Sequence, residues 1–456
     1  MANIMTTDPM PTKPEPTPAN LAPAQPRTTE QGLTRRSFIG LAGAAAATVA
    51  TGPLVGIARP GVAAARPTSA AAAPRSSAAA QGNTIPATPG ILVLVTLYGG
   101  NDGLNMLIPL DAGPYITGRG TLAYQAAEAI PIGEGFGLHP SMTGLKGIWD
   151  RRQLAIVRGV GYPSPSRSHF RSQDIWSSAV PGRYERTGWI GRWYDKVGTN
   201  PLGLAAIANA APQSFTGTIG NGIVVDTIGT RRASGTDFAA ATAILNAPDD
   251  SLGALAARVR TTGNDLGRVD QVFGPLLASQ PPTPIEAATL ESGYTARSAN
   301  VLTDQLNIVA RLIKADAPTR VYAASLGGFD THANERANHA NLMGILDRAL
   351  SGFVQVMSAD PRGLHVTVAV TSEFGRRLAA NGSGGTDHGT AAPVLIAGPS
   401  VKGGFYGDPP SLTDLDQGDL KYTTDFRSIY ATLLAGVLGA DPLTALDPGF
   451  PNLGFI

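Results

Sequence analysis

The chain has 456 residues, of which 43% are apolar and 15% are charged, and its formal net charge is +1 at pH 7. A chain of this size can bury a large core, and its near-zero charge gives no field that would draw it to nucleic acid or to an anionic membrane. We therefore predict a globular protein that does not bind nucleic acid. The absence of cysteine excludes disulfides, thiolate metal sites and a cysteine nucleophile, so Asp, Glu, His, Asn or hydroxyl groups must hold any metal.

Residues 1–65 have the pattern of a leader followed by an export signal. The segment Thr34–Ile39 resembles the twin-arginine motif, and an Ala- and Gly-rich apolar run follows it. The run is broken by Gly52 and Pro53 and is short for a membrane span. We expect passage through the twin-arginine translocase and cleavage near Ala65, with a retained anchor as the alternative. The predicted location is the periplasm, the cell envelope or the exterior.

Residues 66–89 are rich in Ala, Ser and Pro and have almost no bulky apolar side chain. Such a segment cannot bury enough surface to order itself, so we predict a disordered linker. Residues 90–456 then form one domain. Within that domain, about 212–298 carry few strand signals, and we expect an insert packed over the site that contributes to substrate choice.

Five continuous apolar runs in the domain are typical of strands buried on both faces. The runs are 91–98, 154–160, 321–326, 366–371 and 393–397. Apolar residues at three- and four-residue spacing predict helices around 302–314, 337–357 and 426–438. This alternation predicts an α/β fold, a three-layer α/β/α sandwich with a mostly parallel central sheet.

Acidic and histidine side chains follow several of the apolar runs by a few residues. They are Asp102, Asp330 with His332, Glu373, and Asp387 with His388. In open parallel sheets, reactive groups collect outside the carboxyl ends of the strands. A Gly-Gly pair shortly before Asp102 and another before Asp330 allow sharp turns and a close approach to a ligand. The sequence therefore predicts a site assembled from distant segments.

Six segments spread over most of the domain carry a family resemblance. They are Gly99–Asn105, Ser168–Asp174, Thr187–Arg192, Gly328–His332, Ser372–Arg376 and Thr386–Gly389. With these segments in this order, the chain from Leu92 onward resembles the domain-of-unknown-function family 1501, a group of exported bacterial proteins assigned to the alkaline phosphatase-like superfamily. The resemblance implies a sulfatase-like fold.

The resemblance also implies a metal site. Enzymes of that superfamily bind metal through an Asp after the first strand, an Asp with a nearby His, and acidic and His residues after later strands. The positions of this sequence that match those metal ligands are Asp102, Asp330, His332, Glu373 and His388. The resemblance therefore makes them the ligand candidates. They would hold one or two divalent ions, such as Zn, Mn, Ca or Mg.

A nucleophile follows from the same resemblance, because superfamily enzymes place a Ser or Thr before a helix in a similar location. Ser168 precedes a predicted helix whose N-terminus favours an anion, and Ser166 is the reserve. Arg171 and Arg376 would stabilise charge on the oxygens of a phosphate or sulfate ester. His169 would carry protons near neutral pH.

Each of these residues also has a structural interpretation. Asp102 suits an Asn-Asp-Gly turn, Glu373 suits a salt bridge with a neighbouring arginine, and Ser168 suits a helix N-cap. His339 falls within a helical pattern and His365 just before a strand, so we predict that both lie at the surface.

Together these features predict an exported metal-dependent hydrolase of phosphate or sulfate esters, with a small-molecule or glycan ester as substrate. Two alternatives stay open. One is a non-catalytic exported protein that keeps the fold and binds a metal or a glycan. The other is a phosphotransferase or mutase that acts on envelope glycans.

Overall fold

The computed structural model describes residues 90–198, 200–225, 267–269, 271–277 and 296–456. They belong to one compact unit that runs from Ala79 to Ile456. The predicted leader, export signal and linker, and most of the predicted insert at 212–298, lie outside the described residues. Within the described ranges, no helix combines the length and the apolar character needed to cross a membrane.

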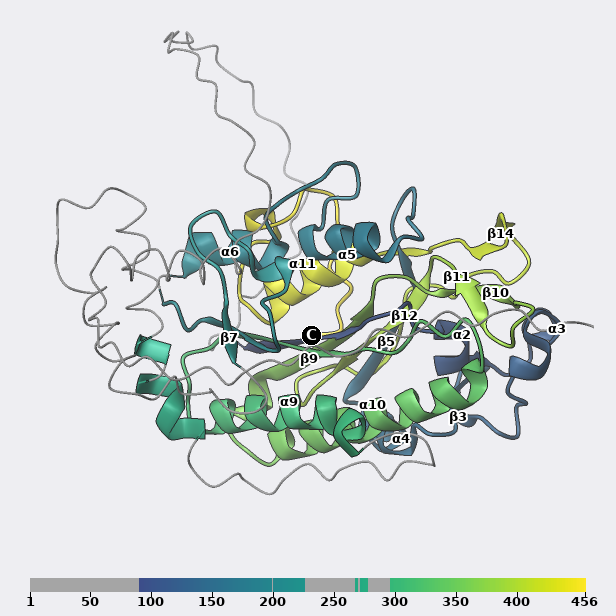
Figure 1. The fold of residues 1–456 in the computed structure, drawn as a ribbon, viewed down its shortest axis with the longest axis horizontal. Helices are drawn as coiled ribbons and strands as arrows, with labels where there is room; N and C mark the ends of the chain where they lie inside the picture. Colours follow the sequence, from purple (N-terminus) through teal and green to yellow (C-terminus); the bar gives the residue numbers. More distant parts are fainter. Residues whose placement is uncertain (1–89, 199, 226–266, 270, 278–295) are drawn as a thin grey trace, which may run out of the picture. The chain divides into compact units, whose positions relative to one another are not determined.

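A nine-stranded sheet forms the centre of the fold (Figure 1). All five predicted strands are present, and their Val, Ile, Leu and Ala content suits strands that are covered on both faces. In spatial order the strands are β13 (Gly404–Tyr406), β5 (Leu154–Gly161), β12 (Ala392–Ala397), β9 (Val366–Ser372), β1 (Ile91–Leu97), β8 (Val321–Leu326), β6 (Leu204–Ile207) and β7 (Ile223–Val225), and β16 (Thr424–Asp425) also pairs with β5.

The sheet is mostly parallel, as predicted, but β12 runs antiparallel to both of its neighbours, β5 and β9. Between β9 and β12 the chain forms a hairpin of β10 (Arg376–Ala380) and β11 (Thr386–His388). No helix carries the chain back across a face of the sheet in this stretch. A strand that re-enters the sheet from the carboxyl edge of β9 must run opposite to β9, because only a crossover connection restores the parallel direction.

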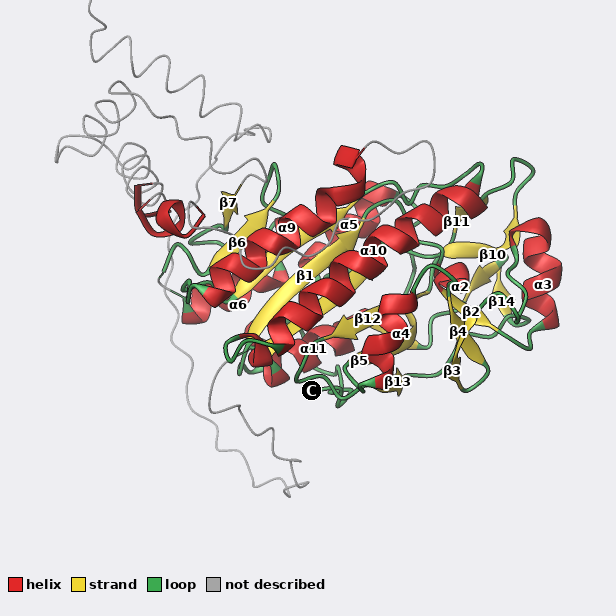
Figure 2. Ribbon diagram, turned by 90° about the horizontal axis from the view of Figure 1, so that it is seen from below, coloured by secondary structure: helices red, strands yellow, loops and turns green. Residues whose placement is uncertain are grey.

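Helices cover both faces of the sheet, which confirms the predicted three-layer sandwich. Figure 1 shows α5, α6 and α11 on one side of the sheet and α4, α9 and α10 on the other, and Figure 2 shows α9 and α10 running alongside β1, which is visible between them. The three predicted helices correspond to α9, α10 and α11. The bounds in these layers are α4 (Thr143–Asp150), α5 (His169–Ser178), α6 (Trp189–Val197), α9 (Ala296–Lys314), α10 (Glu335–Ser358) and α11 (Phe426–Gly436).

Each helical layer closes its own apolar core against the sheet. Side chains alternate along β1, so Val93, Val95 and Leu97 belong to the core under α4, α9 and α10, whereas Leu92 belongs to the core under α5, α6 and α11. All four side chains are at most 2% exposed. Burial on both faces explains why the strands read as continuous apolar runs and not as alternating ones.

Short elements gather beyond the carboxyl end of β1, next to the β10–β11 hairpin (Figure 2). The loops after β1, β8 and β9 and the β10–β11 hairpin carry the predicted metal ligands. The short elements are α2 (Gly103–Met106), α3 (Gly113–Arg119), a three-stranded sheet of β2 (Leu107–Pro109), β4 (Phe136–Leu138) and β3 (Ile130–Gly133), and the pair β14 (Leu415–Asp416) and β15 (Asp419–Leu420). Short 3-10 helices span Gly120–Leu122, Gln213–Phe215, Gly363–His365 and Pro442–Thr444.

Candidate functional site

Asp330 is the centre of a cluster of side chains at the carboxyl edge of the sheet. It follows β8 in a loop that Gly328, at a φ of 102°, helps to turn. Its Oδ1 lies 3.0 Å from the Nε2 atoms of His332 and His388, and its Oδ2 lies 3.6 Å from Nε2 of His169. Residues from three distant segments, at the start of α5, after β8 and at the end of β11, therefore meet at one carboxylate.

The orientation of His388 is fixed by a backbone carbonyl. Its Nδ1 lies 2.8 Å from the carbonyl oxygen of Arg167, and a carbonyl can only accept, so Nδ1 carries the donated proton. In the neutral ring, the lone pair of Nε2 then faces Oδ1 of Asp330 at 3.0 Å. Two electron-rich atoms at this distance repel each other unless the ring is protonated or a cation lies beside them.

His169 is oriented in the same way by a carboxylate. Its Nδ1 donates to Oε1 of Glu373 at 2.8 Å. Its Nε2 is buried and, among the described residues, has no hydrogen-bond partner. A carboxylate that holds one nitrogen of an imidazole while the other nitrogen faces a ligand position is the arrangement found in protein metal sites.

Glu373 lies behind His169 and not beside Asp330. It follows β9 directly, is 2% exposed, and accepts the backbone N–H of Gly99 at 2.9 Å and Nε2 of Gln173 at 3.3 Å. In this structure Glu373, which we predicted as a ligand, orients His169 and does not itself face Asp330. Gln173 was not predicted, although its place four residues after His169 on α5 puts both on one helix face.

His169, Asp330 and His388 could hold a metal ion. Among the described residues they form the one such group of three, with donor atoms within 4.8 Å of one another. A tetrahedral site with metal–ligand distances near 2.1 Å places its donors about 3.4 Å apart, which is close to the separations of 3.0 and 3.6 Å. Two imidazoles and a carboxylate suit zinc or another divalent transition metal. His332 borders the group, because its Nε2 lies 3.0 Å from Nε2 of His388. Its side chain is 45% exposed.

Arg376 joins the loops that build the cluster. Its guanidinium is buried and donates to the carbonyl oxygens of Gly100, Phe329 and Thr386 at 2.6 to 3.0 Å, and to Oδ1 of Asp330 at 2.8 Å. Burial raises the pKa of Asp330, but the hydrogen bond and positive charge of Arg376, together with the neighbouring imidazoles in their protonated form, outweigh it and lower the pKa to about 2. With these donors engaged inside the protein, Arg376 holds Asp330 ionised and in place, and is not turned toward a substrate.

Phe374 packs against both histidines. Its ring centroid lies 4.8 Å from those of His169 and His388, and the side chain is 3% exposed. Gly100, with a φ of 72°, has no room for a side chain because a Cβ there would overlap the Phe374 ring. The ring therefore supports both imidazoles through direct packing.

The structure does not bring Asp102 to this cluster. Both of its oxygens bind Arg119, and Oδ1 also accepts the backbone N–H groups of Leu104 and Asn105 as the N-cap of α2. Asp102 and Arg119 are fully buried. Burial raises the pKa of Asp102, but the charge of Arg119 outweighs it and holds the pKa well below its usual range. With its oxygens so occupied, Asp102 has no free donor for a metal.

A second group of buried ionisable residues surrounds Asp102. Glu335 lies 3.6 Å from Arg119, and His339 binds Asn101 through Nε2 at 3.0 Å. The prediction of a surface position for His339 is wrong, because the side chain is 0% exposed. The helical pattern was correct, but α10 turns this residue inward against the loop after β1, so burial lowers its pKa to about 4.

Ser168 and Arg171 flank the start of α5. Ser168 is exposed and occupies the N-cap position, but its side chain makes no capping hydrogen bond, so the predicted cap bond is absent. Arg171 donates to the carbonyl oxygens of Pro181 and Arg183 at 2.7 and 3.1 Å. Arg171 therefore fixes the loop after α5, and the Ser168 hydroxyl, next to His169 in the chain, is not used to cap the helix.

Residues 286–444 match the model of a family described as "Protein of unknown function (DUF1501)". The predicted family resemblance is confirmed over this stretch. It contains Asp330, His332, Glu373 and His388, whereas His169 lies before it. No curated protein matches the sequence.

Solved structures with a similar fold come from the alkaline phosphatase superfamily and from sulfatases and phosphoesterases. A superfamily protein from Vibrio parahaemolyticus is 11% identical, with coverage of 79% of this chain and 70% of that chain and a TM-score of 0.36. The C-terminal periplasmic domain of EcEptC from Escherichia coli is 10% identical, with coverage of 80% and 86% and a TM-score of 0.37. The phosphonate monoester hydrolase of Agrobacterium radiobacter is 10% identical, with coverage of 81% and 79% and a TM-score of 0.35. At such scores the functional argument rests on this chain's own residues.

Proposed function

We propose that the protein is a metal-dependent hydrolase of phosphate or sulfate esters that acts outside the cytoplasm after export by the twin-arginine translocase. One observation carries the proposal. Two imidazoles whose Nδ1 protons are held by acceptors, His169 and His388, turn their Nε2 lone pairs toward the same carboxylate, Asp330. That arrangement is repulsive by itself and becomes favourable around a divalent cation.

The ion would be held by His169, Asp330 and His388, with His332 as a neighbouring donor. A bound divalent ion supplies positive charge that polarises the oxygens of a phosphate or sulfate group. The chain's own groups prepare the site for it. Glu373 and the carbonyl of Arg167 orient the two rings, and Arg376 keeps Asp330 ionised.

Ser168 is the proposed nucleophile. Its oxygen would form a bond to phosphorus or sulfur while the bond from that atom to the alcohol oxygen breaks, and the alcohol would leave with the electron pair and take up a proton. The serine proton would pass to solvent. Water would then replace the serine oxygen, release phosphate or sulfate and restore the hydroxyl. His169 would not carry this proton, because Glu373 and the metal would occupy its two nitrogens.

The test combines metal analysis with turnover of 4-nitrophenyl phosphate and 4-nitrophenyl sulfate. We expect the purified protein to contain divalent metal and to cleave at least one of the two esters. Asp330→Asn and His388→Ala should lose both metal and turnover, because each removes a donor. Ser168→Ala should keep the metal and lose turnover by about a hundredfold or more.

His365→Ala is the matched control, since His365 is exposed and lies in a 3-10 helix outside the cluster. It should keep both metal and turnover. A metal-loaded protein that cleaves neither ester would refute the hydrolase and favour the non-catalytic binding alternative. Full metal content in Asp330→Asn would refute the metal site.

A further inference from the structure

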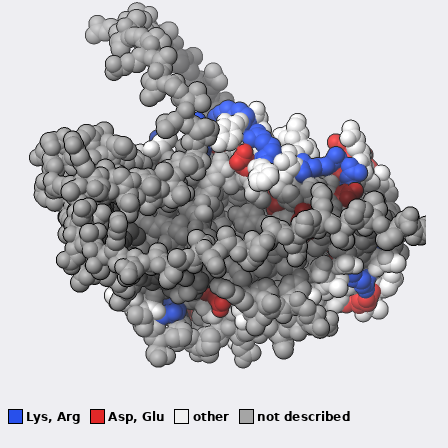
Figure 3. Space-filling model, viewed as in Figure 1, with Lys and Arg blue, Asp and Glu red and all other residues white. Residues whose placement is uncertain are grey.

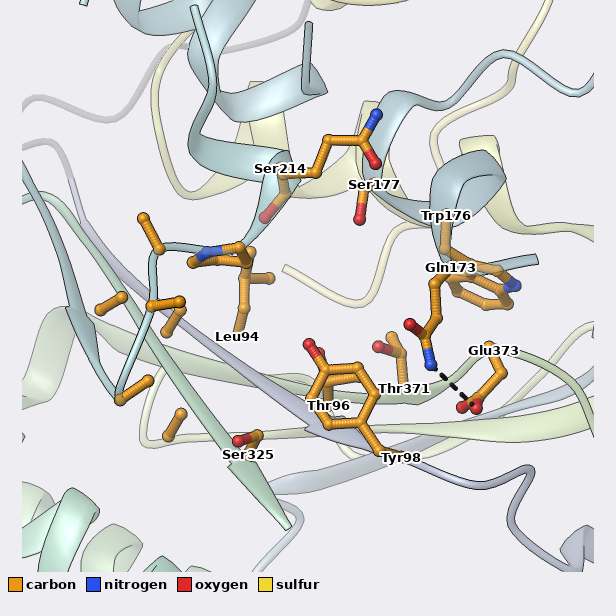
Figure 4. A pocket seen from close by; sticks show the side chains of 18 of the residues that line it. Leu94, Thr96, Tyr98, Gln173, Trp176, Ser177, Ser214, Ser325, Thr371 and Glu373 are labelled. Atoms are coloured by element: carbon orange, nitrogen blue, oxygen red, sulfur yellow. Dashed lines mark hydrogen bonds between the residues drawn. The ribbon is translucent and has the colours of Figure 1, made fainter. Parts of the chain in front are cut away.

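A hollow of about 500 Å³ lies between the sheet and the layer of α5, α6 and α11 (Figure 4). Its floor is formed by β1, β6, β8 and β9, and its opposite wall contains Trp176 of α5, Trp189 of α6 and Tyr430 of α11. The volume is within the range of about 300–1,000 Å³ that is usual for small-molecule pockets. The hollow reaches Glu373, so one of its ends adjoins the metal cluster.

The hollow exists because the side chains of the floor become smaller toward the carboxyl edge. At the amino ends of the strands, residues that face this layer are large and buried. Nearer the cluster, the same face carries Ala, Ser and Thr, which cannot reach the helices. In β1 the series is Leu92, Leu94 and Thr96, and in β8 it is Val321, Ala323 and Ser325.

The two ends of the hollow differ in polarity. Figure 4 shows Gln173 extending from α5 with its amide directed at Glu373, near Tyr98 and Thr371, while Leu94 lies toward the other end. Alanines from β6 and from the loop after it add to the apolar part. Of the described residues that line the hollow, none is Lys, Arg or His, and the charged ones are Asp174 and Glu373. An anionic group is therefore disfavoured inside it.

The hollow is connected to the cluster through a chain of hydrogen bonds. Nε2 of Gln173 donates to Oε1 of Glu373 at 3.3 Å, and the same oxygen accepts Nδ1 of His169 at 2.8 Å. Phe170, the residue after His169, also lines the hollow. The hollow and the cluster therefore adjoin each other at the side chains of Gln173 and Glu373.

We propose that this hollow binds the alcohol part of the ester, and that the preferred alcohol is a bulky, uncharged aryl or alkyl group. The inference rests on the proposed function and specifies its substrate class. The anionic phosphate or sulfate would stay at His169, Asp330 and His388, because the described lining of the hollow has no basic side chain to receive it. The apolar end takes the hydrocarbon, and the hydroxyl and amide groups near Glu373 face the ester oxygen.

The experiment fills the hollow with a larger side chain and compares kcat/KM for a bulky and a small ester of the same acid. Ala208 follows β6, lines the hollow and is partly exposed to it, so Ala208→Phe should occupy the space of the alcohol. We expect kcat/KM to fall by about tenfold or more for the 2-naphthyl ester and to stay within about twofold for the methyl ester. Each variant is compared with wild type on the same ester, which cancels the intrinsic reactivity of the leaving group.

Ala127→Phe on an exposed turn is the matched control. For both esters, its kcat/KM should stay close to that of wild type. Equal losses on the two esters in Ala208→Phe, or no loss on either, would contradict the inference. So would a preference of the wild type for a choline ester over the naphthyl ester, since that would indicate a cationic occupant.

A second measurement tests binding to the hollow independently of the proposed hydrolase activity. Calorimetric titration with 2-naphthol alone should detect binding to wild type and to Ala127→Phe, and at least tenfold weaker binding to Ala208→Phe. This result without any turnover would retain the hollow as a binding site and reject the hydrolase. Turnover without binding of naphthol would retain the hydrolase and reject the inference.

Discussion

At the scale of single residues, two aspartates that follow strands in the same way have different partners and therefore different uses. Asp330 is half exposed and shares its oxygens with Arg376 and imidazoles. Asp102 is fully buried and paired with Arg119. One carboxylate keeps a face open for a ligand, and the other stabilises the loop and α2. The distinction lies in the neighbours and not in the residue type.

We predict that Arg119→Met destabilises the protein by about 3–5 kcal/mol, because it leaves the carboxylate of Asp102 buried without its partner. Metal content should not change, since Asp102 does not belong to the cluster. Urea unfolding and metal analysis of the same samples test both statements. Lys146→Met, which removes an exposed pair with Asp150, is the control and should cost about 0.5 kcal/mol or less. A folded Arg119→Met variant that has lost its metal would contradict this assignment.

At the scale of elements, the cluster depends on how closely the loops after β1, β8 and β9 approach one another. Gly99, at a φ of 118°, lies against the backbone of the loop after β8, and a Cβ there would overlap the backbone nitrogen of Asp330. Its N–H also binds Glu373 across the junction with β9. A single glycine thus sets the spacing between two loops that carry site residues.

We expect Gly99→Ala to destabilise the protein by about 1–3 kcal/mol, through backbone strain and displacement of the Asp330 loop. It should also weaken metal binding, which calorimetric titration with zinc can measure. Gly382→Ala is the matched control, because Gly382 lies in the β10–β11 hairpin loop with open space around its Cβ position. Equal metal affinity in both variants would show that the approach of the loops does not position Asp330.

At the scale of the whole molecule, the cluster around Asp330 and the group around Asp102 lie at the carboxyl edge of the sheet, whereas apolar side chains build the cores on its two faces. On the described part of one face, Figure 3 shows basic and acidic side chains near one another. In the interior, Glu335 lies beside Asp102 and Arg119, and burial together with the charge of Asp102 raises the pKa of Glu335. The surroundings of Glu335 therefore favour its protonated form in the folded protein.

This raised pKa predicts a direction for stability against pH. Above the ordinary pKa of 4.5 the unfolded chain loses the Glu335 proton while the folded protein keeps it. The unfolded state then binds fewer protons, so this group lowers the free energy of unfolding as pH rises, until Glu335 ionises in the folded state as well. Glu335→Gln, which resembles the protonated acid, should remove that decline.

Urea unfolding at about pH 5, 7 and 9 tests this expectation by comparing the slopes of wild type and Glu335→Gln. Glu128→Gln is the control, because a backbone hydrogen bond from Gln125 lowers the pKa of exposed Glu128. That variant should keep the decline. Parallel curves for wild type and Glu335→Gln would show that Glu335 is not protonated in the folded state.

The fold could be predicted from the sequence because burial leaves a local pattern. Strands covered on both faces read as continuous apolar runs such as 91–97, and the amphipathic spacing of α9 and α10 identifies the helices. The antiparallel direction of β12 could not be predicted, since it depends on the path of the chain after β9 and not on the composition of the strand. The outward prediction for His339 failed for a similar reason, because the face that α10 buries depends on what packs against it.

Sequence alone determined that acidic and histidine side chains would collect at the carboxyl edge, because position after a parallel strand fixes the edge where a residue lies. It could not determine which of them share an oxygen or a lone pair. The partners of Asp330, Asp102 and Glu373 are separated from them by distances along the chain that no spacing encodes. Only the tertiary structure decided that His169 faces Asp330 while Arg119 occupies Asp102, because each contact depends on how separate segments of the chain pack against each other.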